Sequence, residues 1–120
     1  MSINNKTFIS EIADTRVTQI KGLSGREAMN QNQGMLFVFN KELFAPFWMN
    51  KMKFSIDIIW IDKDKKIVDI VKSAPVPLND NEIPTFMPAS VAQYVLEIVA
   101  GLSEHYGFHI GDSVGITILE

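Results

Sequence analysis

Alternating apolar positions along the chain predict a mainly β domain. The strongest pattern is Phe54–Ile61, where both faces of an extended segment are almost wholly apolar, as in a strand buried on two sides. The polar turn Asp62–Lys65 leads from it into a second alternating segment, Lys66–Lys72, so the two predict a β-hairpin. Further strands are expected at Thr7–Ala13, Met35–Phe39, Phe47–Met49 and Ser113–Leu119.

Two segments carry helix signals. Ser90 and Gln93 form a capping box, apolar residues then recur at helical spacing, and Gly107 stands where a helix would stop, which predicts a helix over about 90–106. A shorter helix is predicted over about 14–22. Together these elements predict an α+β, mainly β fold. We expect a small barrel-like sheet, antiparallel or mixed, of six or more strands with the two helices against it.

The segment Ser73–Ala89 holds four of the five prolines and a polar run. A connection of this length is uncommon inside a compact domain and is often functional, so it is a candidate wall or lid of a site. The alternative is a proline-stiffened connection that Val76, Leu78 and Phe86 pin to the core.

Composition limits the classes of function. A chain of 120 residues with 47% hydrophobic and 21% charged residues predicts one domain, 1–120. The net charge is 11 − 14 = −3, which gives no electrostatic reason to bind nucleic acid or an anionic membrane. The absence of cysteine excludes disulfides and thiolate catalysis. No cofactor and no metal are expected, and the polar start and short apolar runs predict a cytoplasmic protein.

A series of blocks along the chain is similar to the pattern of a known family. The blocks are Gly22-Leu23-Ser24-Gly25-Arg26, Gly34 to Phe39, Phe47-Trp48-Met49, Asp57 in its strand, Tyr94-Val95-Leu96-Glu97 with Gly101, and Gly107 to Asp112. Their order resembles the family called domain of unknown function 192. The resemblance implies a compact β-barrel-like domain with one or two helices, and it implies no established reaction.

The chain departs from that family's pattern near the polar residues. Ser24 stands where the family has methionine, Trp48 and Met49 are followed by Asn50-Lys51-Met52 in place of a lysine-asparagine-threonine step, and Ser55-Ile56 replaces proline-leucine before Asp57. A cysteine pair that many relatives carry is also absent. A ligand known from relatives would therefore not transfer directly to this chain.

Arg26, Trp48 and Asp57 are the candidate binding residues. Arg26 is one of only two arginines, and Asp57 interrupts an apolar strand, so the two could present a charged fork to a polar ligand. The alternative is structural: the two pair with each other, or Asp57 accepts backbone N–H groups to pin a loop. Trp48 could offer an aromatic platform for a ring, or it could be a core tryptophan.

No catalytic residue is assigned. The chain has no nucleophile elbow, phosphate loop or dinucleotide fingerprint. Asp57 and Glu97 could form an acid/base pair in principle, but Glu97 falls on the polar face of the helix predicted over about 90–106, where it would be exposed.

Three functions remain open from the sequence. The leading hypothesis is a non-enzymatic module that binds a small polar or carbohydrate-like ligand near Trp48, Arg26 and Asp57. The second is a protein-interaction or assembly domain that uses an exposed apolar patch or a free strand edge, for example Thr7–Ala13 or Ser113–Leu119. The third is an enzyme of the hydrolase type. The sequence does not determine the oligomeric state.

Overall fold

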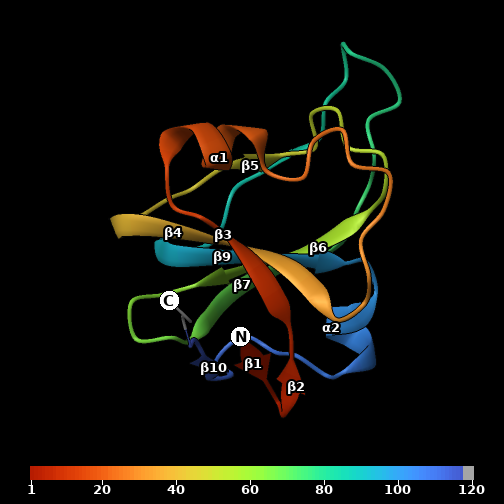
Figure 1. Cartoon of the computed structure of the whole chain (residues 1–120). Coiled ribbons are helices and arrows are strands. Elements are labelled where there is room, and N and C mark those ends of the chain that lie inside the picture. The colour runs from red at the N-terminus through yellow and green to blue at the C-terminus, as the bar shows by residue number, and fades with distance from the viewer. Residues whose placement is uncertain (118–120) are drawn as a thin grey trace.

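A five-stranded sheet forms the middle layer of the computed structural model, which describes residues 1–117. The strands in spatial order are β3 (Ile9–Ala13), β4 (Gln33–Leu43), β9 (Ala92–Val99), β6 (Ile56–Ile61) and β7 (Ile67–Ala74). β3 runs parallel to β4, and the other neighbouring pairs are antiparallel. Helix α1 (Arg16–Lys21) makes the connection between the two parallel strands (Figure 1).

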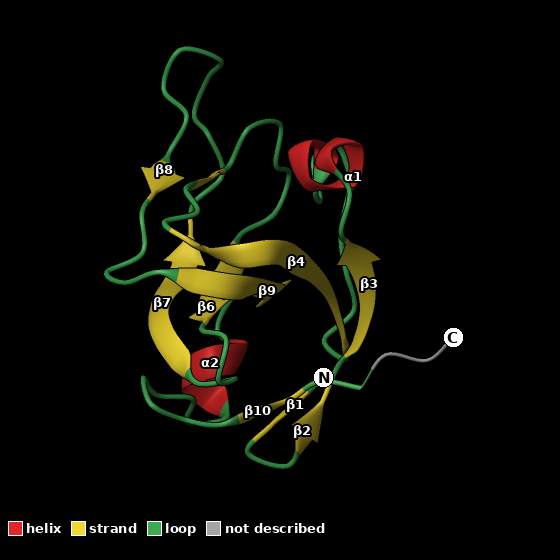
Figure 2. Ribbon diagram, turned by 90° about the vertical axis from the view of Figure 1, so that its left-hand side faces the viewer, coloured by secondary structure: helices red, strands yellow, loops and turns green. Residues whose placement is uncertain are grey.

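Two further layers cover the faces of this sheet. On one side lie α1 and a two-stranded sheet of β5 (Phe47–Trp48) and β8 (Thr85–Phe86). On the other side lie helix α2 (Leu102–His105) and a three-stranded sheet of β10 (Val114–Gly115), β1 (Ser2–Ile3) and β2 (Lys6–Thr7). Figure 2 shows the layers from the side. The sheets are open and do not close into the expected barrel, because β3 and β7 are edges of the central sheet.

The central sheet therefore separates two hydrophobic cores. Ile58 and Trp60 of β6 contribute to the core on the α1 side, whereas Ile59 and Ile61 contribute to the core on the α2 side. All six residues of β6 are buried. This two-sided burial is the physical reason for the continuous apolar pattern of the segment 54–61, and it confirms the predicted hairpin of β6 and β7.

The helix predicted over about 90–106 is wrong for most of its length. Ala92–Val99 is strand β9, paired with both β4 and β6, and only Leu102–His105 is helical. A strand buried on both faces has apolar residues at nearly every position, so a helical stripe can be found in it by chance. The frequent valine and isoleucine residues were the contrary signal, because β-branched side chains favour strands.

The mainly β, α+β class is confirmed, as is the short helix within the predicted span 14–22. Thr15 caps α1 and forms a capping box with Thr18. In the predicted terminal strand Ser113–Leu119, only Val114–Gly115 is strand, and positions 118 onward lie outside the described residues. Within residues 1–117, neither short helix has the length and apolar character needed to cross a bilayer.

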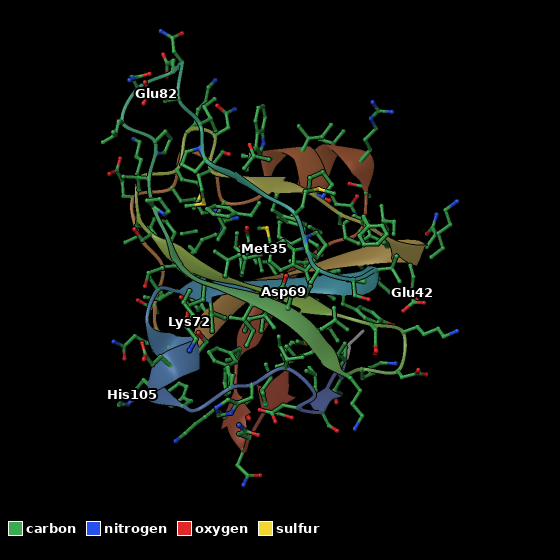
Figure 3. The ribbon with its side chains drawn as sticks, turned by 180° about the vertical axis from the view of Figure 1, so that it is seen from behind. Met35, Glu42, Asp69, Lys72, Glu82 and His105 are labelled. Carbon is green, nitrogen blue, oxygen red and sulfur yellow. The ribbon has the colours of Figure 1, made fainter. Side chains whose placement is uncertain are left out.

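The proline-rich segment Ser73–Ala89 is hydrogen-bonded to the rest of the fold near its C-terminal end, and its middle part extends away from the central sheet (Figure 3). Its β8 pairs with β5, and the Ala89 backbone N–H donates to Asp69 of β7 at 2.8 Å. Glu82 marks the tip of the loop, far from the central sheet (Figure 3). Leu78, expected as a pin to the core, is exposed.

Asp57 pins β7 and the start of α2 to the central sheet. Its carboxylate accepts backbone N–H groups of Ser73 at 2.8 Å, Gly101 at 3.1 Å and Ser103 at 2.9 Å, and the Ser103 hydroxyl at 2.6 Å. Ser73 has a left-handed backbone with φ of 53°, a conformation that this contact helps to hold. Asp57 is fully buried, and the structural alternative in which it accepts backbone N–H groups is the one the fold uses.

Replacing Asp57 is expected to destabilise the fold strongly. Asp57→Ala leaves three backbone donors without their acceptor, so the free energy of unfolding should fall by about 3–5 kcal/mol. Asp57→Asn, which keeps the size but loses the charge, should lie between this variant and the native chain. Urea denaturation measures the change.

Asp64→Ala is the matched control, because Asp64 is exposed in the turn after β6. This variant should change the free energy of unfolding by less than about 0.5 kcal/mol. A similarly small effect for Asp57→Ala would contradict the pinning role.

Candidate functional site

A cavity of about 380 Å³ opens on the α1 side of the central sheet. We call it the α1 cavity. Its apolar lining includes Leu23, Phe37, Phe39, Leu43, Phe47, Trp48 and Met52. Its polar lining residues are Arg16, Gln19, Lys21, Ser24 and Glu97. Aromatic and aliphatic walls with a few polar groups are typical of small-molecule sites.

The chain that carries Trp48 is held firmly over the sheet. The indole N–H of Trp60 donates to the backbone carbonyl of Ala45 at 2.9 Å. Phe47 packs edge-on against Phe37 with ring centroids 4.7 Å apart, and against Trp60 at 6.1 Å. Trp48 itself remains 52% exposed. The buried rings therefore fix the backbone, while the Trp48 side chain stays available at the cavity wall.

Helix α1 forms the opposite wall, and Gln19 holds it on the sheet. The Gln19 amide donates to the backbone carbonyls of Ala13 at 3.1 Å and Val38 at 2.8 Å. Gly22 ends the helix with φ of 48°, and a Cβ at this position would lie 3.3 Å from the Phe37 ring. A glycine here allows both the turn and the close packing beside the cavity.

Glu97 belongs to β9 in the middle of the sheet and lines the α1 cavity. Its cross-strand neighbours are Met35 of β4 and Ile58 of β6, both in the core on the α1 side. Figure 3 shows Met35 among the side chains between the sheet and the α1 layer. Because paired residues point to the same face, Glu97 points there too.

The Glu97 carboxyl is isolated from polar partners. The residue is 4% exposed, and its carboxyl makes no hydrogen bond or ion pair with other residues in 1–117. Burial penalises the charged form and raises the pKa of Glu97 from 4.5 to about 8. Glu97 is therefore mainly a neutral carboxylic acid at pH 7.

Two expectations about Glu97 are corrected by this geometry. It is buried on a strand and not exposed on a helix, because the segment 92–99 is β9. It also cannot act together with Asp57 as an acid/base pair. Asp57 pairs with Ile98 in register while Ile58 pairs with Glu97, so the two carboxyls point to opposite faces of the sheet.

The structure does not bring Arg26, Trp48 and Asp57 together. Trp48 lines the α1 cavity, Asp57 is buried beneath the opposite face, and Arg26 forms an ion pair with Glu11. Both partners of this pair are partly exposed, at 39% and 59%, and Arg26 is not among the cavity-lining residues. The suggested Arg26–Asp57 pair does not form.

Sequence reasoning missed Glu97 as a lining residue, together with Arg16 and Lys21. The signal for Glu97 was present: like Asp57, it is an acidic residue inside a long apolar run. No comparable signal marked Arg16 and Lys21, which line the cavity only because α1 packs across the sheet. The proline-rich segment, expected as a wall, contributes no residue to the α1 cavity and instead supports β5 through β8.

The described part of the chain holds no group of three His, Asp or Glu side chains that could bind a metal ion. Within the α1 cavity, Glu97 is the one carboxyl among residues 1–117. The chemistry available in the cavity is therefore apolar contact, one carboxyl group at the sheet, and two cationic side chains from α1.

The raised pKa of Glu97 predicts a pH-dependent stability. Between pH 4.5 and about 8 the unfolded chain has an ionised Glu97 while the folded chain keeps its proton, so this group's contribution falls as pH rises. Glu97→Gln removes the titration. The free energy of unfolding of this variant relative to the native chain should therefore rise between pH 5 and pH 8, by up to about 1.4 kcal/mol per pH unit.

Urea denaturation of both chains at pH 5, 6, 7 and 8 measures this difference. Other titrating groups are the same in both chains and cancel in the comparison. Parallel pH profiles for the two chains would show that Glu97 titrates alike in the folded and unfolded states.

The family model and the curated relatives point to the same family. The model of the DUF192 family, described as "Uncharacterized ACR", matches residues 1–116. The chain is 28% identical over 106 residues to a UPF0127 protein of Thermococcus sibiricus, covering 87% of this chain and 63% of that protein. It is 30% identical over 112 residues to a UPF0127 protein of Thermococcus gammatolerans, covering 92% and 67%. The chain thus spans about two thirds of the length of these relatives.

A solved structure has the same fold. A protein of unknown function from Novosphingobium aromaticivorans superposes with a TM-score of 0.84 at 32% identity, covering 91% of this chain and 75% of that one. The family model, the relatives and the fold agree with the resemblance found in the sequence blocks. This chain therefore belongs to the DUF192 family of uncharacterised proteins.

Proposed function

We propose that this domain is a binding module that takes a small molecule with a mainly apolar body into the α1 cavity. The observation that carries the proposal is the cavity itself, with aromatic walls and Trp48 half-exposed at its side. Its volume of about 380 Å³ lies within the range of small-molecule sites.

The polar lining favours an apolar ligand over the carbohydrate-like ligand expected from the sequence. The Gln19 amide already donates to two backbone carbonyls, and the Ser24 hydroxyl donates to the Asn50 carbonyl at 2.7 Å. A sugar brings many hydroxyl groups, and each would lose its hydration without gaining a partner. An aromatic or aliphatic body loses nothing comparable and gains contact with the walls.

The charges of α1 restrict the ligand further. Arg16 and Lys21 both line the cavity. Burial raises the pKa of Glu97, so its carboxyl is mostly uncharged at pH 7. The charged side chains at the cavity at neutral pH are therefore mainly the two exposed cations of α1. This supports neutral or anionic ligands and disfavours cations.

The test uses 1-anilinonaphthalene-8-sulfonate, an aromatic anion, as the probe. We expect saturable binding at pH 7, with amide NMR shifts at residues that line the α1 cavity. Trp48→Ala should weaken the affinity about fivefold or more, because a half-buried indole offers a large contact area. Fluorescence titration gives the affinities.

Phe44→Ala is the matched control. Phe44 is an exposed aromatic residue four positions before Trp48, but it does not line the cavity, so its loss should leave the affinity unchanged. Equal affinities for the native chain and Trp48→Ala, or shifts confined to other surfaces, would refute binding in the α1 cavity.

A second candidate function, association between copies of the chain, is favoured by one observation. β3 is an edge of the central sheet and carries exposed Ile9 and Ile12, at 72% and 38%. Such an edge is a template for strand pairing. If this candidate holds, light scattering after size exclusion should show a dimer at micromolar concentration that Ile9→Lys dissociates. A monomer at all concentrations would remove it.

A further inference from the structure

The Glu97 carboxyl is the buried polar group of the α1 cavity that the fold leaves without a hydrogen-bond partner among residues 1–117, whereas Arg16 and Lys21 are exposed on α1. Gln19 and Ser24 are engaged with backbone carbonyls, as described above. By contrast, Glu97 is more than nine-tenths buried, makes no hydrogen bond there, and lines the cavity. Within residues 1–117 the fully enclosed side-chain polar atom without a partner is Ser10 Oγ. The Glu97 carboxyl differs from it because it faces the α1 cavity, where a bound molecule can supply the hydrogen bond that buried polar groups normally have.

Asp57 shows that this fold can satisfy a buried carboxyl when the carboxyl serves structure. It accepts four hydrogen bonds one position along the neighbouring strand, on the opposite face of the sheet. The groups around Glu97 offer nothing similar, since its cross-strand neighbours are Met35 and Ile58. The carboxyl of Glu97 thus ties no element of the fold together and is open to a partner in the cavity.

We propose that the Glu97 carboxyl, buried at the floor of the α1 cavity, donates a hydrogen bond to an oxygen of the bound ligand, so that the cavity selects small apolar molecules carrying a carbonyl-type acceptor. The inference rests on the proposed function and names its ligand class. A carboxylic acid offers one O–H donor, and a carbonyl oxygen is a complementary acceptor that costs less to desolvate than a charged oxygen.

The surrounding charges favour an acceptor over an ammonium group. The other charged side chains that line the cavity, within residues 1–117, are Arg16 and Lys21 from α1. The lining residues of β4, of β5 and of the segments between them carry no charge. A cationic ligand would meet the like charges of α1, whereas an acceptor oxygen would meet a donor at the sheet and the two cationic side chains of α1.

Three probes of nearly equal size separate the alternatives. Acetophenone carries a carbonyl oxygen, α-methylstyrene has a methylene group in its place, and 1-phenylethylamine carries an ammonium group at neutral pH. Each is titrated at pH 7 into the native chain, Glu97→Gln and Glu97→Met, with amide NMR shifts of the cavity-lining residues as the readout. Thermal unfolding confirms that each variant is folded.

The measured quantity is the preference, defined as the dissociation constant of α-methylstyrene divided by that of acetophenone. Glu97→Met has similar length but no donor, so the preference should fall about fivefold, the size expected for one net hydrogen bond. Glu97→Gln keeps an N–H donor and should retain most of the preference. The amine should bind the native chain more weakly than acetophenone.

The pH dependence gives an independent readout. The carboxyl loses its proton as pH rises past about 8, so the preference of the native chain should decline between pH 7 and pH 9. The Gln amide does not titrate, and Glu97→Gln should keep its preference over the same range.

The outcomes distinguish this inference from the proposed function. If acetophenone and α-methylstyrene bind in the α1 cavity with the same preference in the native chain and in Glu97→Met, the cavity binds ligands but Glu97 does not select them. Tighter binding of the amine would also overturn the inference. If no probe shifts the cavity-lining residues, both the proposed function and the inference fail.

Discussion

Burial of the central sheet on both faces is the constraint on which the rest of the structure depends. β6 and β9 lie in the interior of the sheet, with a separate hydrophobic core above and below them. A polar side chain in the middle of these strands is removed from water, whichever face it points to. Asp57 and Glu97 are the acidic residues of those two strands, and both are buried.

The buried carboxyls on the two faces of the sheet differ in their hydrogen bonding. On the α2 side, Asp57 has four donors and ties β7 and α2 to the sheet. On the α1 side, Glu97 has no partner in the described chain, and its pKa is raised because desolvation acts without compensation. The carboxyl on one face thus holds structural elements together, and the carboxyl on the other face lines a cavity without a partner in the described chain. This contrast separates residues that hold the fold from those that form the candidate site.

The cavity exists because rigid packing surrounds a place that remains open. Trp60 is fully buried, yet its indole N–H fixes Ala45 and, with Phe47, the course of the chain toward Trp48. The pairing of β5 with β8 supports the same segment from the proline-rich side. Sites on rigid supports can hold a ligand without a large cost in ordering. The two tryptophans thus have different roles, one in the scaffold and one at the cavity wall.

The sequence by itself determined the local elements: the β6–β7 hairpin, the short helix α1, the mainly β class and the family blocks. These follow from residue order, turn chemistry and periodicity, which act over a few positions. It misread the segment 92–99 as helix, because a strand covered on both faces loses the alternation that identifies strands. Only the tertiary structure decided that Asp57 and Glu97 face opposite sides, that Arg26 pairs with Glu11, and that Trp48 and Glu97 share a cavity. Those facts depend on which strands become neighbours, and strand pairing joins residues far apart in the chain.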